Sequence, residues 1–222
     1  MSLIGLQIYL ALKFSFFITK KNISIFSLLV GFSLPEAGSF FILLNNLLTD
    51  SKNKLYLLDK DLTHSLITIG IIYLLFLIVY EIKKRESILK TANGIIAGML
   101  INIFIDILIR LGNIDIFWPL PIITLNNYDY PAIVFNFFLI LEFIFFRLTY
   151  YQLIELTLKK AISNKHLKYL SYWMKILNLF LFILIITIFL FNTKILIIFN
   201  LLYIISYSGL LVSIFILKEV IE

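Results

Sequence analysis

The sequence contains no cysteine, and this absence excludes disulfide bonds, thiolate metal sites and cysteine nucleophiles. Residues that interrupt helices are also scarce, since the chain of 222 residues has 8 glycines and 4 prolines. Apolar residues are abundant instead: they make up 61% of the chain, and its mean hydropathy is +1.02. Soluble proteins contain roughly 45–50% apolar residues. The composition therefore predicts an integral membrane protein, and residues 1–222 are few enough for a single membrane domain.

The charge balance is basic, with 19 lysines and arginines against 13 acids and a net charge of +6. In an apolar chain this excess is explained by cytoplasmic loops. We therefore expect the lipid bilayer as a partner and no nucleic acid. The basic runs at Lys20–Lys21, Lys83–Arg85 and Lys159–Lys168 fall on one side if the hydrophobic segments alternate across the membrane. This bias predicts an N-terminus outside and a C-terminus inside.

The hydrophobic segments predict an all-α fold, a polytopic membrane helical bundle with about six or seven transmembrane segments. The segment at 23–34 is short for a span, and we expect its helix to stop before Pro35 because proline disfavours helix at the preceding residue. Residues 1–130 contain most of the recognisable motifs, and residues 131–222 contain three hydrophobic helices. The expected spans are 2–19, 23–34, 62–80, 95–111, 132–158, 169–191 and 195–217, and the apolar piece at 40–48 is expected to be interfacial or re-entrant.

Polar and ionisable residues gather at the predicted outer ends of several segments, where a bilayer makes them costly and a function is the default hypothesis. Helix geometry brings Glu36, Asp59, His64, Asn102 and Asp106 to similar levels, with Asn102 one turn deeper than Asp106 on the same face. An imidazole together with carboxylate and amide oxygens suits a divalent cation such as zinc. The alternative is a hydrogen bond between His64 and Asp106 that only holds helices together.

The order of the motifs around these residues resembles the YdjM-like (LexA-regulated) family of membrane-bound metal-dependent hydrolases, particularly its cyanobacterial and plastid-type members. The motifs are LPEAG at 34–38, DKDLTHSL at 59–66, G-x3-GMLIN-x3-D at 94–106 and Trp118-Pro119 after Gly112. The resemblance implies that His64 and Asp106 are ligands and catalytic residues. It also implies that Ser65 and Trp118-Pro119 support them, and that Glu36 corresponds to the first acid of the family's LPDID motif.

Several positions depart from the family pattern. Asp59 and Asn102 stand where the family has histidines, Gly38 stands where it has a second acid, and no histidine lies near Leu6 or Gln7. Asp59 and Asn102 keep oxygen ligands, but an oxygen-rich site binds zinc less well than a histidine-rich one. We therefore expect a hydrolytic activity that is weakened or lost.

Three functions follow from these patterns. The resemblance implies a metal-dependent hydrolase of a phosphoester or another bond in a lipid-like substrate. The loss of ligand residues favours a non-catalytic structural or assembly subunit of a larger membrane complex, for instance a photosynthetic one. A transporter component ranks last, because the sequence shows no pair of broken helices in corresponding halves. The expected location is a bacterial inner membrane, or a thylakoid or plastid membrane in a phototroph.

Overall fold

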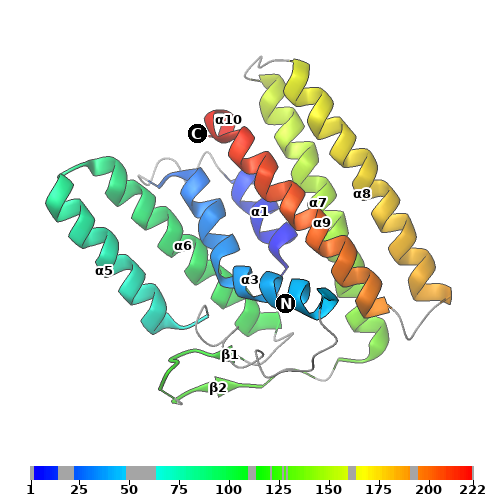
Figure 1. Ribbon diagram of the computed structural model, residues 1–222, viewed down its shortest axis with the longest axis horizontal. Coiled ribbons are helices and arrows are strands. Elements are labelled where there is room, and N and C mark those ends of the chain that lie inside the picture. Colours follow the sequence, from blue (N-terminus) through cyan, green and yellow to red (C-terminus); the bar gives the residue numbers. More distant parts are fainter. Residues whose placement is uncertain are drawn as a thin grey trace. The chain divides into compact units, whose positions relative to one another are not determined.

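The computed structural model (Figure 1) describes residues 3–14, 23–48, 64–109, 114–120, 122–126, 128, 130–159, 164–190 and 195–221. Within these ranges it gives no side chains for 37–48, 114, 164, 190, 195–197, 219 and 220. The elements are α1 (Ile4–Lys13), α3 (Ile25–Leu48), α5 (Leu66–Lys83), α6 (Glu86–Ile109), β1 (Ile114–Asp115), β2 (Thr124–Leu125), α7 (Ala132–Lys159), α8 (Asn164–Leu190), α9 (Ile195–Ile216) and α10 (Lys218–Ile221).

The helical membrane class predicted from the sequence is confirmed. Five helices in the described part of the chain are long and apolar enough to cross a membrane. Helices are the natural form for such segments, because a bilayer offers no water to the backbone and each helix satisfies its own N–H and C=O groups. Two shorter apolar helices, Ile4–Lys13 and Ile25–Glu36, correspond to the first two predicted segments. Whether they also span stays a prediction. The five long helices are Leu66–Lys83, Glu86–Ile109, Ala132–Lys159, Lys165–Phe189 and Ile198–Ile216.

The chain divides into two compact units. The first contains Met1–Ile4 and Phe14–Asp129, and the second contains Gly5–Lys13 and Tyr130–Glu222. The first unit consists of α3, α5, α6 and the β1–β2 hairpin. Within it α6 packs against both α3 and α5, which makes α6 the central helix of the unit.

The expected helix end before Pro35 is wrong. Pro35 lies inside α3, which continues to Leu48 and bends along its length (Figure 1). Proline removes a backbone donor and clashes with the carbonyl one turn earlier, so a bend is its usual effect. Apolar helices tolerate such a residue because neighbouring groups satisfy the freed backbone atoms. Because α3 continues past Pro35, Glu36 lies on a helix and not in a loop.

From Ser24, the residue just before α3, up to Glu36, four residues spaced one helical turn apart each contact the α6 residue that lies 70 positions later in the sequence. Phe32 and Asn102 are one such pair. The constant separation shows that α3 and α6 run parallel. The contacts are close because two glycines of α6 lie on the α3 backbone: a Cβ on Gly94 would lie 2.9 Å from the Ser24 carbonyl, and one on Gly98 would collide with the Leu28 carbonyl. The four pairs are Ser24–Gly94, Leu28–Gly98, Phe32–Asn102 and Glu36–Asp106.

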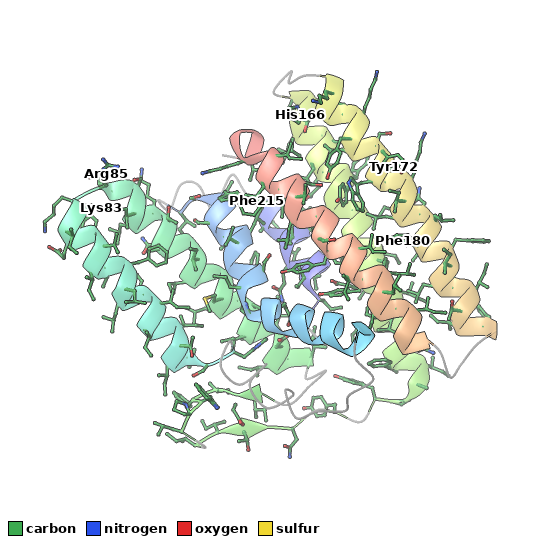
Figure 2. All side chains as sticks on the ribbon, in the orientation of Figure 1. Lys83, Arg85, His166, Tyr172, Phe180 and Phe215 are labelled. Carbon is green, nitrogen blue, oxygen red and sulfur yellow. The ribbon has the colours of Figure 1, made fainter. Side chains whose placement is uncertain are left out.

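The turn between α5 and α6 is short and basic. Lys84 has the left-handed backbone conformation (φ 50°), and its N–H donates to the Tyr80 carbonyl at 2.7 Å. This C-cap ends α5, so that α6 begins at Glu86, earlier than the predicted start at residue 95. Lys83 and Arg85 lie at the turn (Figure 2).

The second unit has an aromatic interior. Tyr150 is fully buried, and its hydroxyl pairs with the Ser213 hydroxyl at 3.0 Å between α7 and α9. Glu142 of α7 is also fully buried and accepts a hydrogen bond from the Gly5 N–H at 2.9 Å. This contact attaches the first turn of α1 to α7, since a helix N-terminus presents free donors and favours negative charge. The buried rings are Phe143, Phe146, Tyr150, Phe199, Tyr203 and Tyr207.

Candidate metal centre

The N-terminus of α5 fixes the position of His64. Ser65 is the N-cap: its backbone is extended, and its Oγ accepts from the Ile67 N–H at 3.1 Å. The same hydroxyl donates to the Trp118 carbonyl at 2.7 Å, and the Leu66 N–H donates to the Ile116 carbonyl at 2.8 Å. The helix start is thereby bonded twice to the β1–β2 hairpin. His64 is the residue just before this doubly held cap.

The hairpin itself is small. β1 and β2 pair antiparallel, with Asp115 opposite Thr124. Its connection contains the cis peptide Trp118–Pro119. The Ser65 and Trp118-Pro119 motifs, which lie 53 residues apart in the sequence, therefore meet in one hydrogen-bonded corner.

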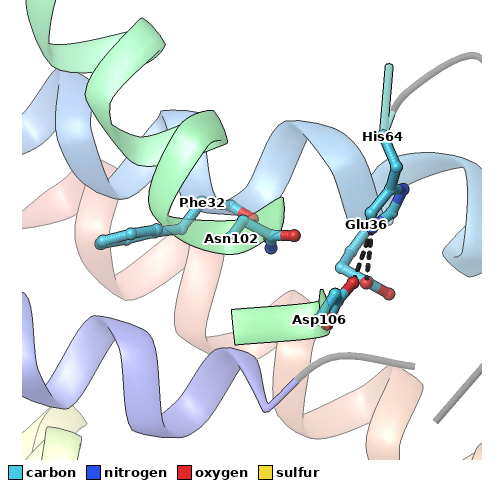
Figure 3. Close-up of polar contacts among 5 residues, drawn as sticks. All are labelled: Phe32, Glu36, His64, Asn102 and Asp106. Atoms are coloured by element: carbon cyan, nitrogen blue, oxygen red, sulfur yellow. Dashed lines mark hydrogen bonds and ion pairs between the residues drawn. The ribbon is translucent and has the colours of Figure 1, made fainter. Parts of the chain in front are cut away.

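Glu36, His64 and Asp106 come together from three separate segments of the first unit (Figure 3). His64 Nε2 lies 2.8 Å from Asp106 Oδ2 and 3.6 Å from Glu36 Oε1. One ligand atom from each of the three lies within 4.8 Å of the others. We call these three residues the triad. His64 comes from the α5 cap, Glu36 from α3 beside Pro35, and Asp106 from the last turn of α6.

The other two predicted ligands, Asn102 and Asp59, are not part of the triad. Asn102 is fully buried one turn before Asp106, and its Nδ2 donates to the Phe32 carbonyl at 3.0 Å. Figure 3 shows Asn102 beside Phe32. Phe32 is in turn one helical turn before Glu36. This hydrogen bond locks the register of α3 and α6 just below the triad. Asp59 lies outside the described residues.

The three residues of the triad are buried, so their net charge must be compensated within the site. Glu36 is 2% exposed, His64 is 0% exposed and Asp106 is 3% exposed. Two carboxylates beside a neutral imidazole would place two negative charges out of water, which is very costly unless they are compensated. Either protons or a cation must balance them. A divalent cation balances both carboxylates while the imidazole stays neutral.

Two opposing effects act on the pKa of His64: burial and the two neighbouring carboxylates. Burial lowers the pKa of His64, but the hydrogen bond with Asp106, the polar contact with Glu36 and the charges of these carboxylates outweigh burial. The net result is a pKa above the ordinary value of 6.5. His64 therefore holds a proton readily when no cation takes its place.

The donor set and its spacing fit a divalent cation. One imidazole nitrogen and two carboxylate oxygens form a hard-to-borderline set, and three protein ligands leave a position open for water or substrate. Ligands at about 2.1 Å from a tetrahedral cation lie about 3.4 Å from one another. The observed separations of 2.8 and 3.6 Å from His64 Nε2 lie on either side of this value. Small side-chain movements suffice to admit the ion.

Two features of the site were missed by sequence reasoning. The Phe32 carbonyl that holds Asn102 has no side-chain signal, because any residue supplies a carbonyl. The close approach of α3 and α6 did have one: Gly94 and Gly98 form a G-x3-G pair, which is typical of tightly packed membrane helices.

No family model, no curated protein and no solved structure matches this chain. The resemblance to the YdjM-like family therefore stays a prediction based on motif order.

Proposed function

We propose that this chain is a membrane-embedded, metal-dependent hydrolase whose divalent cation is bound by Glu36, His64 and Asp106. The observation that supports it is the convergence of three buried ionisable residues from three segments, with ligand atoms within 4.8 Å. In an apolar protein such residues are costly and mark functional positions. The charge argument adds to this, because two carboxylates and a neutral imidazole are balanced by one divalent ion.

Each residue of the triad has a distinct part. His64 Nε2 faces both carboxylates, so ligation requires the tautomer with its proton on Nδ1. Asp106 is the nearest carboxylate to the imidazole and orients it. Glu36 is the more distant carboxylate, at 3.6 Å, and completes the set of three ligands. These residues would hold a divalent cation, which when bound would supply Lewis-acid chemistry and lower the pKa of a coordinated water.

The proposed substrate is a phosphoester, or a related bond, in a lipid-like molecule. His64 lies two residues before a helix that is long and apolar enough to span a membrane, so the triad belongs at the level of the lipid headgroups. Trp118, whose carbonyl bonds the α5 cap, has an indole of the kind that is enriched at this level. A site at the headgroup level is suited to substrates that reside in the bilayer.

A non-catalytic structural or assembly role is the second candidate, and one observation favours it. The His64–Asp106 contact of 2.8 Å already meets hydrogen-bond geometry without any cation. Together with the Ser65–Trp118 bond it holds α5, α6 and the hairpin in place. In this case the triad is a structural element of a subunit that works within a larger membrane complex.

Metal content distinguishes the two candidates. The chain is purified in neutral detergent, incubated with zinc or manganese, freed of loose metal and assayed by elemental analysis. We expect about one ion per chain, and loss of it in His64→Ala and in Glu36→Gln. The matched control is Glu142→Gln, which changes a buried carboxylate of the second unit and should keep the ion. Absence of bound metal in the unaltered chain would leave only the structural role.

Catalysis is tested separately with a chromogenic phosphodiester dispersed in the same detergent. Hydrolysis that requires the added metal and disappears in Asp106→Asn would support the hydrolase. Metal binding without hydrolysis of this probe or of phospholipid micelles would instead assign the ion a structural part.

A further inference from the structure

A groove between α5 and α6 lies at the opposite end of α5 from the triad. Its volume is about 370 Å³, within the range of roughly 300–1,000 Å³ typical of ligand sites. His64 precedes the first residue of α5 and Lys83 is its last, so the 18 residues of the helix separate the two places by about 27 Å. The groove is lined by Leu75, Phe76, Val79, Lys83, Ser87, Ile88 and Thr91.

Most of the groove wall is hydrocarbon. Leu75 and Val79 come from one face of α5 and are 57% and 40% exposed, and Phe76 and Ile88 are half-buried beside them. Both helices are candidate membrane spans, so this wall is in contact with lipid. An acyl chain fits an apolar depression of this kind.

One end of the groove is cationic. Lys83 lines it directly, and Ser87 places a hydroxyl at the same end. The neighbouring Lys84 makes an ion pair with Glu81 and does not line the groove. Arg85 adds a further positive charge to the turn, where Figure 2 shows it beside Lys83. The groove thus combines an apolar floor with a positive rim that has a hydrogen-bond donor.

We propose that this groove binds one anionic phospholipid from the leaflet that faces the α5–α6 turn. Its acyl chain lies along Leu75, Phe76 and Val79, and its phosphate lies at Lys83 with a hydrogen bond from the Ser87 hydroxyl. The pairing of an apolar floor and a cationic rim selects an amphiphile with a negative head. A soluble phosphate would use only the rim, and a zwitterionic lipid would gain little from it.

The test measures thermal stabilisation of the full chain in neutral detergent, because a ligand of the folded state raises stability with its concentration. The probes are phosphatidylglycerol, phosphatidylcholine and glycerol phosphate. We expect stabilisation by phosphatidylglycerol at concentrations where the other two have little effect. Lys83→Gln should weaken the apparent affinity for phosphatidylglycerol about fivefold, since a basic residue near a lipid surface contributes about 1 kcal/mol.

Two variants identify the groove itself. Lys84→Gln removes the same charge one residue away and should leave the affinity unchanged, because Lys84 pairs with Glu81. Val79→Phe keeps every charge but fills the floor, and should weaken binding of the lipid. Equal losses in Lys83→Gln and Lys84→Gln would overturn the proposal in favour of a diffuse charge effect. Equal stabilisation by phosphatidylcholine or by glycerol phosphate would overturn it as well.

Discussion

His64 lies between two carboxylates, and none of the three residues is exposed to water. Its ionisation therefore depends on what else the site holds. A proton on the imidazole compensates part of the negative charge, whereas a divalent cation compensates all of it and needs the imidazole neutral. Proton and cation compete for the same nitrogen, and the two forms of the site respond to pH in opposite directions.

The first prediction is this reversal of the pH dependence. The pKa of folded His64 is raised above 6.5 by Asp106 and Glu36. A raised pKa stabilises the fold fully below the unfolded value near 6.5, and this contribution is lost as pH rises through the folded value. The chelated protein should therefore lose stability as pH rises above about 6.5. With saturating metal, stability should instead increase over the same range, because ligation releases the proton.

Thermal unfolding at a series of pH values, with chelator and with metal, measures both slopes. His64→Gln is the control, and it should flatten the two curves relative to the unaltered chain. If the chelated protein kept its falling slope in His64→Gln, another group would be responsible. If metal left the slope unchanged, the cation would not be using His64.

Among the helices, the parallel pair α3 and α6 determines whether the triad forms. Each turn of contact repeats the 70-residue separation up to Glu36 and Asp106, so a change in spacing at one turn is passed to the next. Protein interiors are so closely packed that even one added methyl group disturbs the packing. The glycines that permit the close approach are thus part of the construction of the site, although they lie two or more turns away from it.

The second prediction compares two glycine-to-alanine changes. A Cβ on Gly98 would collide with the α3 backbone, whereas a Cβ on Gly70 of α5 meets nothing within 4 Å. Gly98→Ala should destabilise the protein by about 2 kcal/mol through overpacking and should lower its metal content. Gly70→Ala should leave metal content unchanged and stabilise by up to about 1 kcal/mol, since alanine favours helix.

Unfolding midpoints and elemental analysis on the two variants are the measurements. The chemical change is the same in both, so any difference reports on the α3–α6 contact. Equal metal content in Gly98→Ala and the unaltered chain would show that the ion tolerates a wider helix spacing.

Sequence reasoning succeeded where local chemistry dominates. Apolar runs predicted the long helices, although α6 begins at Glu86 and not at residue 95. Counting from helix ends brought Glu36, His64 and Asp106 to one level. It failed at Pro35, because the local preference of the proline was overridden by the need of an apolar segment to satisfy its backbone within a helix. The Asn102–Phe32 hydrogen bond was also beyond reach, since its acceptor is a backbone carbonyl whose position depends on the α3–α6 register.

For the whole molecule, an alternation of the long helices across the membrane would predict which loops share a side. If α5 to α9 each cross once, the α5–α6 turn and the α7–α8 connection lie on one side. The β1–β2 hairpin then lies on the other, with the triad. The basic residues at Lys83–Arg85 and around His166 predict that the first side is cytoplasmic, by the positive-inside tendency.

The third prediction is this arrangement, and the absence of cysteine makes it directly measurable. Single cysteines are introduced as Lys84→Cys, His166→Cys and Ile122→Cys, the last in the exposed hairpin connection. A membrane-impermeant maleimide added to intact cells should label only Ile122→Cys. In inverted vesicles it should label Lys84→Cys and His166→Cys and spare Ile122→Cys. The unaltered chain controls for background in both. Labelling of Lys84→Cys and Ile122→Cys from the same side would mean that α5 or α6 does not cross. The triad would then not lie at the membrane surface opposite the basic turn.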